Sequence, residues 1–508
     1  MKNITFIICI LILLSIPAKA QTAKVKAIDE FIEKMFDSLE YIPSISIGIV
    51  HNGKIVHKKA YGFSDVKNSI PATTSTQYYI ASTTKSFTAL ASVLLEEKGL
   101  LDFNKSLEDY FSEVNFPDSI QAHKIKIPDL LGHTSGIDNC GYMTLKLAYT
   151  GAYTYMQLFE LMNKTCGRLS YGTYRYSNLG YNIMNLIFLK ELGKTWKEVV
   201  QEEVLDPIGM AHTYSSYVKL LENKEEIAVP YNALGNGKEL FEISRYTKKD
   251  ATLHAAGGLY SSVDDVLKWL LIQVNNGKNN NKTIISPTSL FETRKIRNEI
   301  EGMDFGLDRF NISYGLGWNI AKYKGKTLYH HGGAYTGYLT MISYMPETKS
   351  GVVVMVNDSK LGHLYTNKLS MLAYDAIDEK FKKENKDWEE AYYNWLKDLK
   401  FQTESVGKKV IYKDFLNRSK RKWNFSVPKN AITGIYKSKD NENVDLIRIF
   451  ENKNGFSIKQ GEWNALVEPY KDLNTIRVQF IRPGVFKLDV EGEWVKGFSY
   501  DGNYYQKM

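Results

Sequence analysis

Metal-ligand spacings and cysteines are scarce in this sequence. Neither His-x-x-x-His nor Cys-x-x-Cys occurs in its 508 residues, so no zinc site and no cofactor are expected. Three cysteines are present, and Cys9 lies in the leading apolar run. The other two, Cys140 and Cys166, form either a disulfide or two separate thiols, because sequence spacing does not fix their geometry.

Long apolar runs are also lacking after the first 20 residues. Residues 1–20 combine a basic start, an apolar run from Ile4 to Ile16 and the small-x-small sequence Ala18-Lys19-Ala20. This pattern is typical of a cleaved secretory signal peptide, so we expect an exported protein, periplasmic or secreted, whose mature chain begins at Gln21. No later apolar stretch is long enough to cross a bilayer, and no membrane span is expected.

A strong excess of one charge is absent as well. The formal net charge is +8, and removal of Lys2 and Lys19 with the leader lowers it to +6. Spread over the remaining chain, this charge is too weak to indicate a nucleic-acid partner. The chain is longer than a single hydrophobic core supports and predicts two or three domains.

What the sequence does contain is a serine at the start of an apolar helix. Ser82 and Lys85 lie three residues apart, so their side chains point the same way, near the free N–H groups and positive dipole end of that helix. A lysine kept neutral by partial burial is able to accept the serine proton. An N-cap serine beside a solvated lysine is the alternative. The spacing alone is weak, because Ser-x-x-Lys also begins at Ser64, Ser216, Ser405, Ser419 and Ser426.

The two ends of the first 360 residues predict strands, and the middle predicts helices. Ser44 to Val50 alternates, a tight-turn signal follows, and Ile55 to Ala60 returns as a hairpin. We expect this hairpin and the late strands to form one antiparallel sheet, because either piece alone is too small for a stable core. The late strand signals lie at 315–321, 327–330, 337–345 and 352–357, and the helical segments at 181–192, 196–204 and 263–274.

The residue pattern of the sequence changes near Pro428. Residues 369–399 look helical and lead through a basic run, and from Pro428 onward short alternating segments are separated by turns. This pattern predicts a small all-β, barrel-like domain. The predicted organisation is a signal peptide (1–20), a main α/β (α+β) domain (21–368), a helical and basic connector (369–427) and a C-terminal β domain (428–508).

Three further motifs follow Ser82 in order. They are Leu131 to Ile137 (LGHTSGI), Tyr171 to Tyr181 (YGTYRYSNLGY) and His330 to Tyr338 (HHGGAYTGY). Together with LDPIGM at 205–210 and AAGGLYS at 255–261, they resemble the serine β-lactamase and penicillin-binding-protein superfamily over residues 30 to 360. Within it they are most similar to the class C β-lactamase-like branch, which also contains esterases and D-amino-acid peptidases. The resemblance implies an antiparallel sheet flanked by helices with a helical subdomain.

The resemblance implies a proton-handling group around the serine. By motif position, Ser82 is the nucleophile, Lys85 its proton partner and Tyr176 a second base or acid. A tyrosine beside a lysine ammonium has its phenolate favoured, so Tyr176 is expected to shuttle protons. His133 is expected to be a structural histidine in its loop, without a catalytic role.

The resemblance also implies substrate-binding positions. Asn178, His331 and Gly333 are expected to contact the substrate, and the backbone N–H groups of Ser82 and Ala334 to form the oxyanion hole. Strict β-lactamases and carboxypeptidases have Lys-Thr-Gly where this chain has His-Gly-Gly, so a fixed cation and a hydroxyl for the substrate carboxylate are missing.

This departure favours a serine hydrolase that cleaves ester or amide bonds of a small molecule or peptide through an acyl-enzyme. Two alternatives stay open. One is a D-alanyl-D-alanine carboxypeptidase or β-lactamase that acts on cell-wall-like substrates. The other is a non-catalytic relative that binds peptidoglycan or peptides, although such a protein has no need to retain serine, lysine, tyrosine and asparagine together.

Overall fold

The computed structural model describes most of the chain after residue 24. The described residues are 25–508 except 40, 140–142, 145, 152, 167–168, 234–239, 243–246, 305–308, 408–420, 441–444, 454, 479–483 and 501–502. The expected signal peptide and Cys140 therefore lie outside the described residues. Cys166 is disulfide-bonded.

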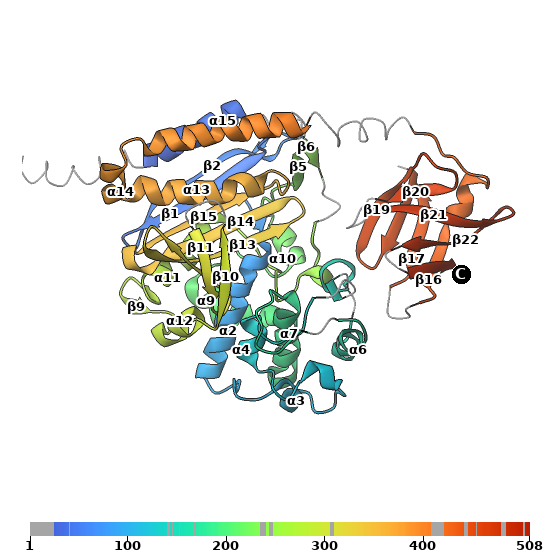
Figure 1. The fold of residues 1–508 in the computed structure, drawn as a ribbon, viewed down its shortest axis with the longest axis horizontal. Coiled ribbons are helices and arrows are strands. Elements are labelled where there is room, and N and C mark those ends of the chain that lie inside the picture. Colours follow the sequence, from blue (N-terminus) through green and yellow to red (C-terminus); the bar gives the residue numbers. More distant parts are fainter. Residues whose placement is uncertain are drawn as a thin grey trace, which may run out of the picture.

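One antiparallel sheet of nine strands is the centre of the larger lobe (Figure 1), in the order β10-β11-β12-β13-β14-β15-β1-β2-β3. The predicted union of the early hairpin with the late strands is confirmed, because β1 pairs with β15, with Ile47 opposite Val354. The strands are β1 (Ser44–His51), β2 (Lys54–Asp65), β3 (Ile70–Pro71), β10 (Asn298–Asp304), β11 (Arg309–Tyr314), β12 (Asn319–Tyr323), β13 (Lys326–Tyr335), β14 (Tyr338–Met345) and β15 (Ser350–Val356).

Helices cover both faces of this sheet. Val353 and Met355 belong to the core that contains α11 (Val263–Val274). Val352 and Val354 belong to the core that contains α13 (Gly362–Ile377). Because neighbouring residues of a strand point to opposite faces, α11 and α13 lie on opposite sides of the sheet. Both cores are continuous, so β15 is buried along its whole length.

The helices after β15 are part of the α13 layer. α14 (Glu379–Glu384) is a short exposed turn, and α15 (Trp388–Gly407) follows it. α15 buries Trp388, Tyr392, Leu396 and Leu399 at helical spacing in the same core as α13, together with the helix at 25–38. The helices within 369–407, which the sequence placed in a connector, therefore belong to the larger lobe (Figure 1).

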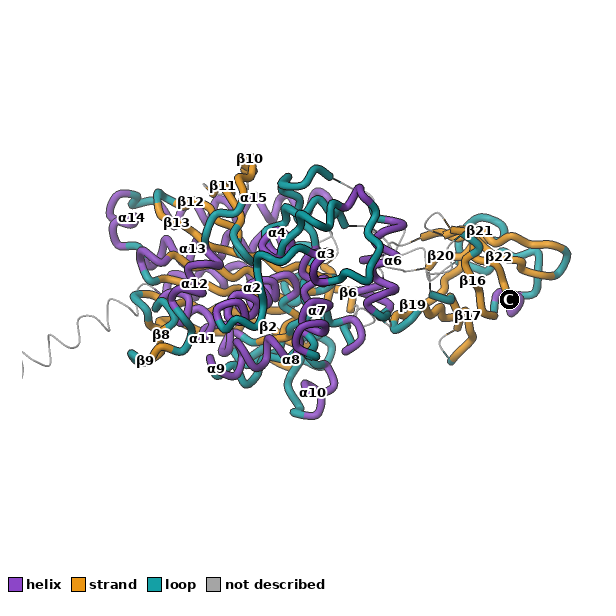
Figure 2. The backbone as a smooth tube through the Cα atoms, turned by 90° about the horizontal axis from the view of Figure 1, so that it is seen from below, coloured by secondary structure: helices purple, strands orange, loops and turns teal. Residues whose placement is uncertain are grey.

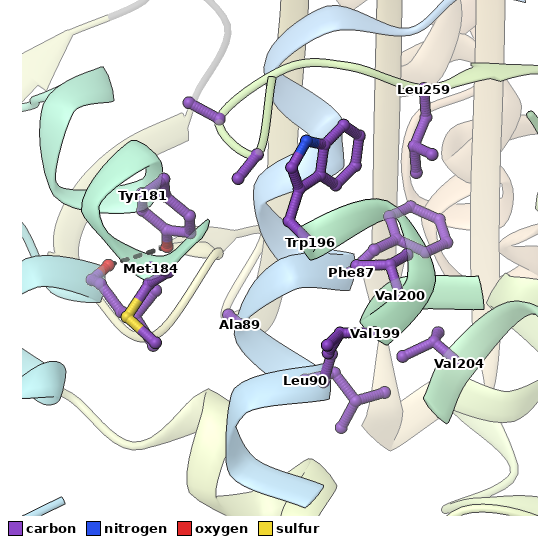
Figure 3. Packing of buried hydrophobic residues seen from close by; sticks show 14 of the residues in the cluster. Phe87, Ala89, Leu90, Tyr181, Met184, Trp196, Val199, Val200, Val204 and Leu259 are labelled. Carbon is purple, nitrogen blue, oxygen red and sulfur yellow. Dashed lines mark hydrogen bonds between the residues drawn. The ribbon is translucent and has the colours of Figure 1, made fainter. Parts of the chain in front are cut away.

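The helical subdomain fills the middle of the chain. α7 (Asn178–Leu192) begins three residues before the predicted 181–192, because the Ser177 hydroxyl caps it by accepting from the Leu179 N–H at 3.2 Å. Figure 3 shows Phe87 and Leu90 of α2 (Thr84–Glu97) facing Trp196 of α8 (Trp196–Val200). The remaining helices are α3 (Leu107–Tyr110), α4 (Ile127–Leu131), α6 (Tyr155–Thr165), α9 (Asp206–Ile208), α10 (Tyr217–Glu222) and α12 (Pro287–Arg294).

Three pairs of short strands, each of two or three residues, complete the larger lobe. β4 (Tyr78–Tyr79) pairs with β7 (Tyr260–Ser261) directly before Ser82. The other two pairs are β5 (Tyr231–Ala233) with β6 (Leu240–Glu242), and β8 (Lys278–Asn279) with β9 (Lys282–Thr283).

The C-terminal lobe is a closed antiparallel barrel of eight strands, which confirms the predicted barrel-like β domain. It lies beside the larger lobe in both views (Figures 1 and 2). Its core has its own buried residues, among them Ile447 and Phe498. The strands are β16 (Gly434–Ser438), β17 (Ile447–Asn452), β18 (Gly455–Gln460), β19 (Trp463–Pro469), β20 (Thr475–Val478), β21 (Gly484–Glu491), β22 (Trp494–Tyr500) and β23 (Asn503–Lys507).

Within 25–508, apart from the gaps given above, no helix is both long enough and apolar enough for a bilayer crossing. The same residues hold no group of three or more His, Cys, Asp or Glu side chains arranged to bind a metal ion.

Candidate active site

Ser82 occupies a tight turn between β4 and α2. It is half-buried in the 3₁₀ turn Ala81–Thr83, which runs directly into α2. Ala81 has φ = 46°, a left-handed conformation that alanine rarely adopts. Such strain persists only where the surroundings hold it, and it is found mostly at functional sites. The turn therefore presents Ser82 in a conformation that the neighbouring segments must enforce.

A glycine of β13 and a glycine of the loop before β7 lie close to this turn. A Cβ on Gly333 of β13 would lie 2.0 Å from the Ile80 carbonyl oxygen. A Cβ on Gly257, in the AAGGLYS phrase, would lie 3.2 Å from the carbonyl carbon of Ala81. Only glycine permits the first approach, because no real Cβ comes that close to another backbone. These contacts explain why both glycines stand in the motifs.

Lys85 is fully buried one turn after Ser82 and has three oxygen neighbours. Its Nζ lies 3.2 Å from Ser82 Oγ and 2.7 Å from both Asn178 Oδ1 and the Ala256 carbonyl oxygen. Burial lowers the pKa of Lys85 well below its ordinary value of 10.5. A neutral amine has two N–H bonds and one lone pair, and the two amide oxygens accept the two N–H bonds. The lone pair then faces the Ser82 hydroxyl, as a proton acceptor requires.

Asn178 and its neighbours are fixed by an asparagine that no sequence motif singled out. The Asn139 side chain accepts from the Asn178 N–H at 2.9 Å and donates to the Tyr176 carbonyl at 3.1 Å. It thus holds both ends of the Tyr-Ser-Asn segment. Its position two residues after the LGHTSGI motif is the signal that could have identified it.

Tyr176 lies against both Ser82 and Lys85. Its hydroxyl is hydrogen-bonded to Ser82, and the Lys85 Nζ is 4.9 Å from its ring centroid. Burial raises the pKa of Tyr176 above its ordinary value of 10.0. With its pKa raised by burial, Tyr176 is a protonated phenol near neutral pH and not the phenolate that the sequence favoured.

His133 is a structural residue, as the sequence analysis expected. Its Nδ1 accepts from the Ser177 N–H at 3.1 Å, and its carbonyl accepts from the Arg175 N–H at 2.8 Å. Its ring centroid lies 4.5 Å from that of Tyr176. Burial lowers the pKa of His133 well below 6.5, so the ring is neutral. His133 therefore supports the loop that carries Tyr176.

His331 lies behind Tyr176 and away from the cavity beside Ser82. Its Nδ1 is 2.8 Å from the Gly332 carbonyl oxygen and must donate to it, so Nε2, 3.1 Å from the Tyr314 hydroxyl, accepts. Burial lowers the pKa of His331 to about 3. In this environment His331 is a neutral ring.

A cavity of about 120 Å³ opens beside Ser82, and we call it the Ser82 cavity. Ala334, whose N–H is the second expected oxyanion donor, contributes to it. Among the described residues, neither His331 nor Gly333 lines it, so the structure does not bring these two expected contact residues to its wall. Other polar residues that line it are Asn139, Asn178, Asn182, Lys248 and His254.

The comparisons with known proteins agree with this geometry. The family model described as Beta-lactamase matches residues 32–373. Protein flp of Staphylococcus aureus (strain NCTC 8325 / PS 47) is 25% identical over 324 residues, which is 62% of this chain and 60% of flp. The chain thus spans about 60% of the length of this curated relative.

Two solved structures share the fold. The octameric penicillin-binding protein homologue from Pyrococcus abyssi has a TM-score of 0.57 and 21% identity, covering 95% of this chain and 100% of its own. The D-amino acid amidase from Ochrobactrum anthropi SV3 has a TM-score of 0.56 and 19% identity, covering 71% of this chain and 98% of its own. At these identities the likeness shows the fold.

Proposed function

Because the chain belongs to the Beta-lactamase family, we propose that it is an exported serine hydrolase that cleaves ester or amide bonds through an acyl-enzyme on Ser82. The observation that carries the proposal is the buried Lys85 amine, whose Nζ lies 3.2 Å from Ser82 Oγ and 2.7 Å from each of two amide oxygens. A surface lysine would be protonated at neutral pH and would not serve as a base.

Acylation follows from this arrangement. The Ser82 Oγ–H proton passes to the Lys85 amine as Oγ bonds to the substrate carbonyl carbon, and the carbonyl oxygen becomes an oxyanion. The N–H groups of Ser82 and Ala334 stabilise that oxyanion. Tyr176, a protonated phenol hydrogen-bonded to Ser82, gives its proton to the leaving group as the carbonyl–leaving-group bond breaks. The proton held by Lys85 then restores the Tyr176 phenol.

Deacylation reverses the roles. Water loses a proton to the same lysine–tyrosine pair while its oxygen bonds to the acyl carbon, and Ser82 Oγ leaves and is reprotonated. The acid product departs and the resting site is regenerated. Asn178 keeps the lysine in place through both steps, because it accepts from Nζ at 2.7 Å.

The neutral His331 bears on the choice among substrates. A β-lactamase or D-alanyl-D-alanine carboxypeptidase of this family has a lysine at that strand position for the substrate carboxylate. Here a buried, neutral imidazole occupies it, with both ring nitrogens engaged by Gly332 and Tyr314. This supports simple esters or amides over β-lactams as substrates.

We therefore expect kcat/KM for a neutral p-nitrophenyl ester to exceed that for a chromogenic cephalosporin by well over tenfold. That ratio corresponds to more than about 1.4 kcal/mol of transition-state preference. Steady-state kinetics on the mature protein, with Ser82→Ala as the control for background hydrolysis, give both constants. Equal efficiency on the two substrates would contradict the argument from His331, and no Ser82-dependent turnover on a panel of esters and D-amino-acid amides would contradict the function itself.

A further inference from the structure

A buried lysine that the proposed mechanism does not use lies in the wall of the Ser82 cavity. Lys248 is 2% exposed, and its Nζ donates to the Ala148 carbonyl. Lys85 takes part in the proton path, but Lys248 lies on a different segment, the loop before the AAGGLYS phrase. An ammonium has three N–H donors, and a single backbone oxygen satisfies one of them.

Tyrosine rings surround this amine. The Lys248 Nζ lies 4.4 Å from the ring centroid of Tyr335, 4.6 Å from that of Tyr149 and 6.0 Å from that of Tyr79. The faces of aromatic rings attract a cation, so they reduce the cost of holding a charge there. They do not replace a counter-ion.

The described carboxylates near this loop have other partners. Asp250 pairs with Lys197 at 3.5 Å, and Glu462 pairs with Lys249 at 3.7 Å. Among the described residues, no carboxylate forms an ion pair with Lys248 Nζ. Burial lowers the pKa of Lys248 well below 10.5, and a carboxylate brought beside it would restore the charged form. Lys248 is therefore placed to form an ion pair with an anion that enters the cavity.

Lys248 also lies between two cavities. Besides the Ser82 cavity, it lines a second cavity of about 270 Å³ with Tyr149 and Tyr335. The far wall of this second cavity comes from the barrel, at the turn from β18 to β19, and includes Glu462 and Trp463. This turn is fixed to the larger lobe, because the Glu462 N–H donates to the Thr150 carbonyl at 2.9 Å. A substrate that extends from Ser82 toward the barrel thus passes the lysine.

From this geometry we infer that Lys248 binds a carboxylate of the substrate, so that the preferred ester or amide carries an anionic group. The inference rests on the proposed function and names its substrate class. The position differs from the strand position of the family's lysine: Lys248 packs against Tyr335, four residues beyond His331 on β13. A substrate chosen by Lys248 need not be one that a Lys-Thr-Gly strand accepts.

Two matched substrate pairs test the inference and locate the carboxylate. The first is p-nitrophenyl hydrogen glutarate and its methyl ester, with the charge on the acyl part. The second is 4-acetoxybenzoate and its methyl ester, with the charge on the leaving group. Wild-type protein is expected to prefer the anionic member of one pair in kcat/KM. Lys248→Met is expected to reduce that preference by about 10- to 100-fold while leaving turnover of the neutral member within about threefold.

An exposed lysine outside both cavities provides the control. Lys282 of β9 is exposed and lines neither cavity, and Lys282→Met removes a charge of the same sign, so the preference is expected to remain. A purely structural role for Lys248 would lower turnover of both members of a pair equally, which would overturn the inference. A wild-type preference for the neutral members would overturn it without any variant, even if Lys248→Met failed to fold.

A binding measurement separates this inference from the proposed function. Calorimetric titration of Ser82→Ala protein with monomethyl glutarate, 4-acetoxybenzoate and their methyl esters needs no turnover. Binding of either anion that is lost in Ser82→Ala/Lys248→Met, without turnover by the wild type, would support the subsite and contradict the hydrolase. Binding that is unchanged by Lys248→Met, or equal for the anion and its methyl ester, would contradict the subsite whatever the turnover.

Discussion

Lys85→Met is expected to lower kcat on a p-nitrophenyl ester by about 10³, within the 10²–10⁴ range of a lost general base. Without the amine, Ser82 loses the nitrogen that lies 3.2 Å from its Oγ. No hydrogen bond joins Ser82 to His133, whose Nδ1 accepts from Ser177, or to His331, which is bonded to Gly332 and Tyr314. Tyr176→Phe is expected to lower kcat by about 10², because the leaving group then loses its proton donor. Stopped-time assays at saturating substrate measure both.

The double variant tests whether the two groups act as one unit. If Lys85 and Tyr176 belong to one proton path, the loss in Lys85→Met/Tyr176→Phe should be much smaller than the product of the single losses. Tyr174→Phe, which removes a hydroxyl from the same loop, should keep near-wild-type activity. Circular dichroism should show an intact fold in each variant. Multiplicative losses would mean independent roles, and an active Tyr176→Phe would remove the tyrosine from the mechanism.

Gly333→Ala is expected to lower kcat/KM by about 10²–10³, the cost of losing an oxyanion donor. The new methyl group would lie 2.0 Å from the Ile80 carbonyl oxygen, so β13 must move away from the Ser82 turn. The Ala334 N–H, the next residue of that strand, moves with it. Steady-state kinetics on the neutral ester measure the loss.

The preceding glycine is the matched control for this substitution. A Cβ on Gly332 would meet only the Met341 Cε, at 3.4 Å, and that flexible end is able to shift. Gly332→Ala should therefore stay within about threefold of wild-type kcat/KM, since side-chain contacts of this kind are ordinary in packed proteins. Gly333→Ala activity equal to that of Gly332→Ala would show that the close approach of β13 does not position the oxyanion donor.

The parts of the site that the sequence predicted are those where chemistry restricts a short segment. Ser82 and Lys85 are brought together by one helical turn, so their spacing alone gives the contact. Gly333 and Gly257 stand where another backbone leaves no room for a side chain. Such local requirements are visible in an ordered set of motifs. The single sheet was predicted on a different ground. The early hairpin and the late strands are each too small for a stable core alone, and the structure joins them.

Other features depend on tertiary burial, which spacing does not reveal. The protonation of Tyr176 and His331 follows from the packing around them and not from their motifs. Lys248 stands in no motif, and only the folded loop carries it to the wall of the Ser82 cavity. Asn139 lies just outside a motif and acts through contacts with a segment about 40 residues further along the chain.

The misplaced connector has a similar cause. The sequence placed residues 369–427 in a helical and basic connector, and α14 within that range contains no buried residue. On either side, however, α13 and α15 each bury apolar side chains in one core of the larger lobe. The high local charge was a correct sign that α14 is not part of the core. It did not indicate that the two helices joined by α14 are packed in the core.

The central claim is that Ser82 forms the covalent acyl-enzyme, and intact-mass spectrometry after treatment with a fluorophosphonate tests it most directly. The account predicts one adduct per wild-type chain and none on Ser82→Ala under the same conditions, with peptide mapping placing the label on Ser82. It also predicts much slower labelling of Lys85→Met, because the base is gone. Equal labelling of wild-type protein and Ser82→Ala would contradict the claim and move the nucleophile elsewhere.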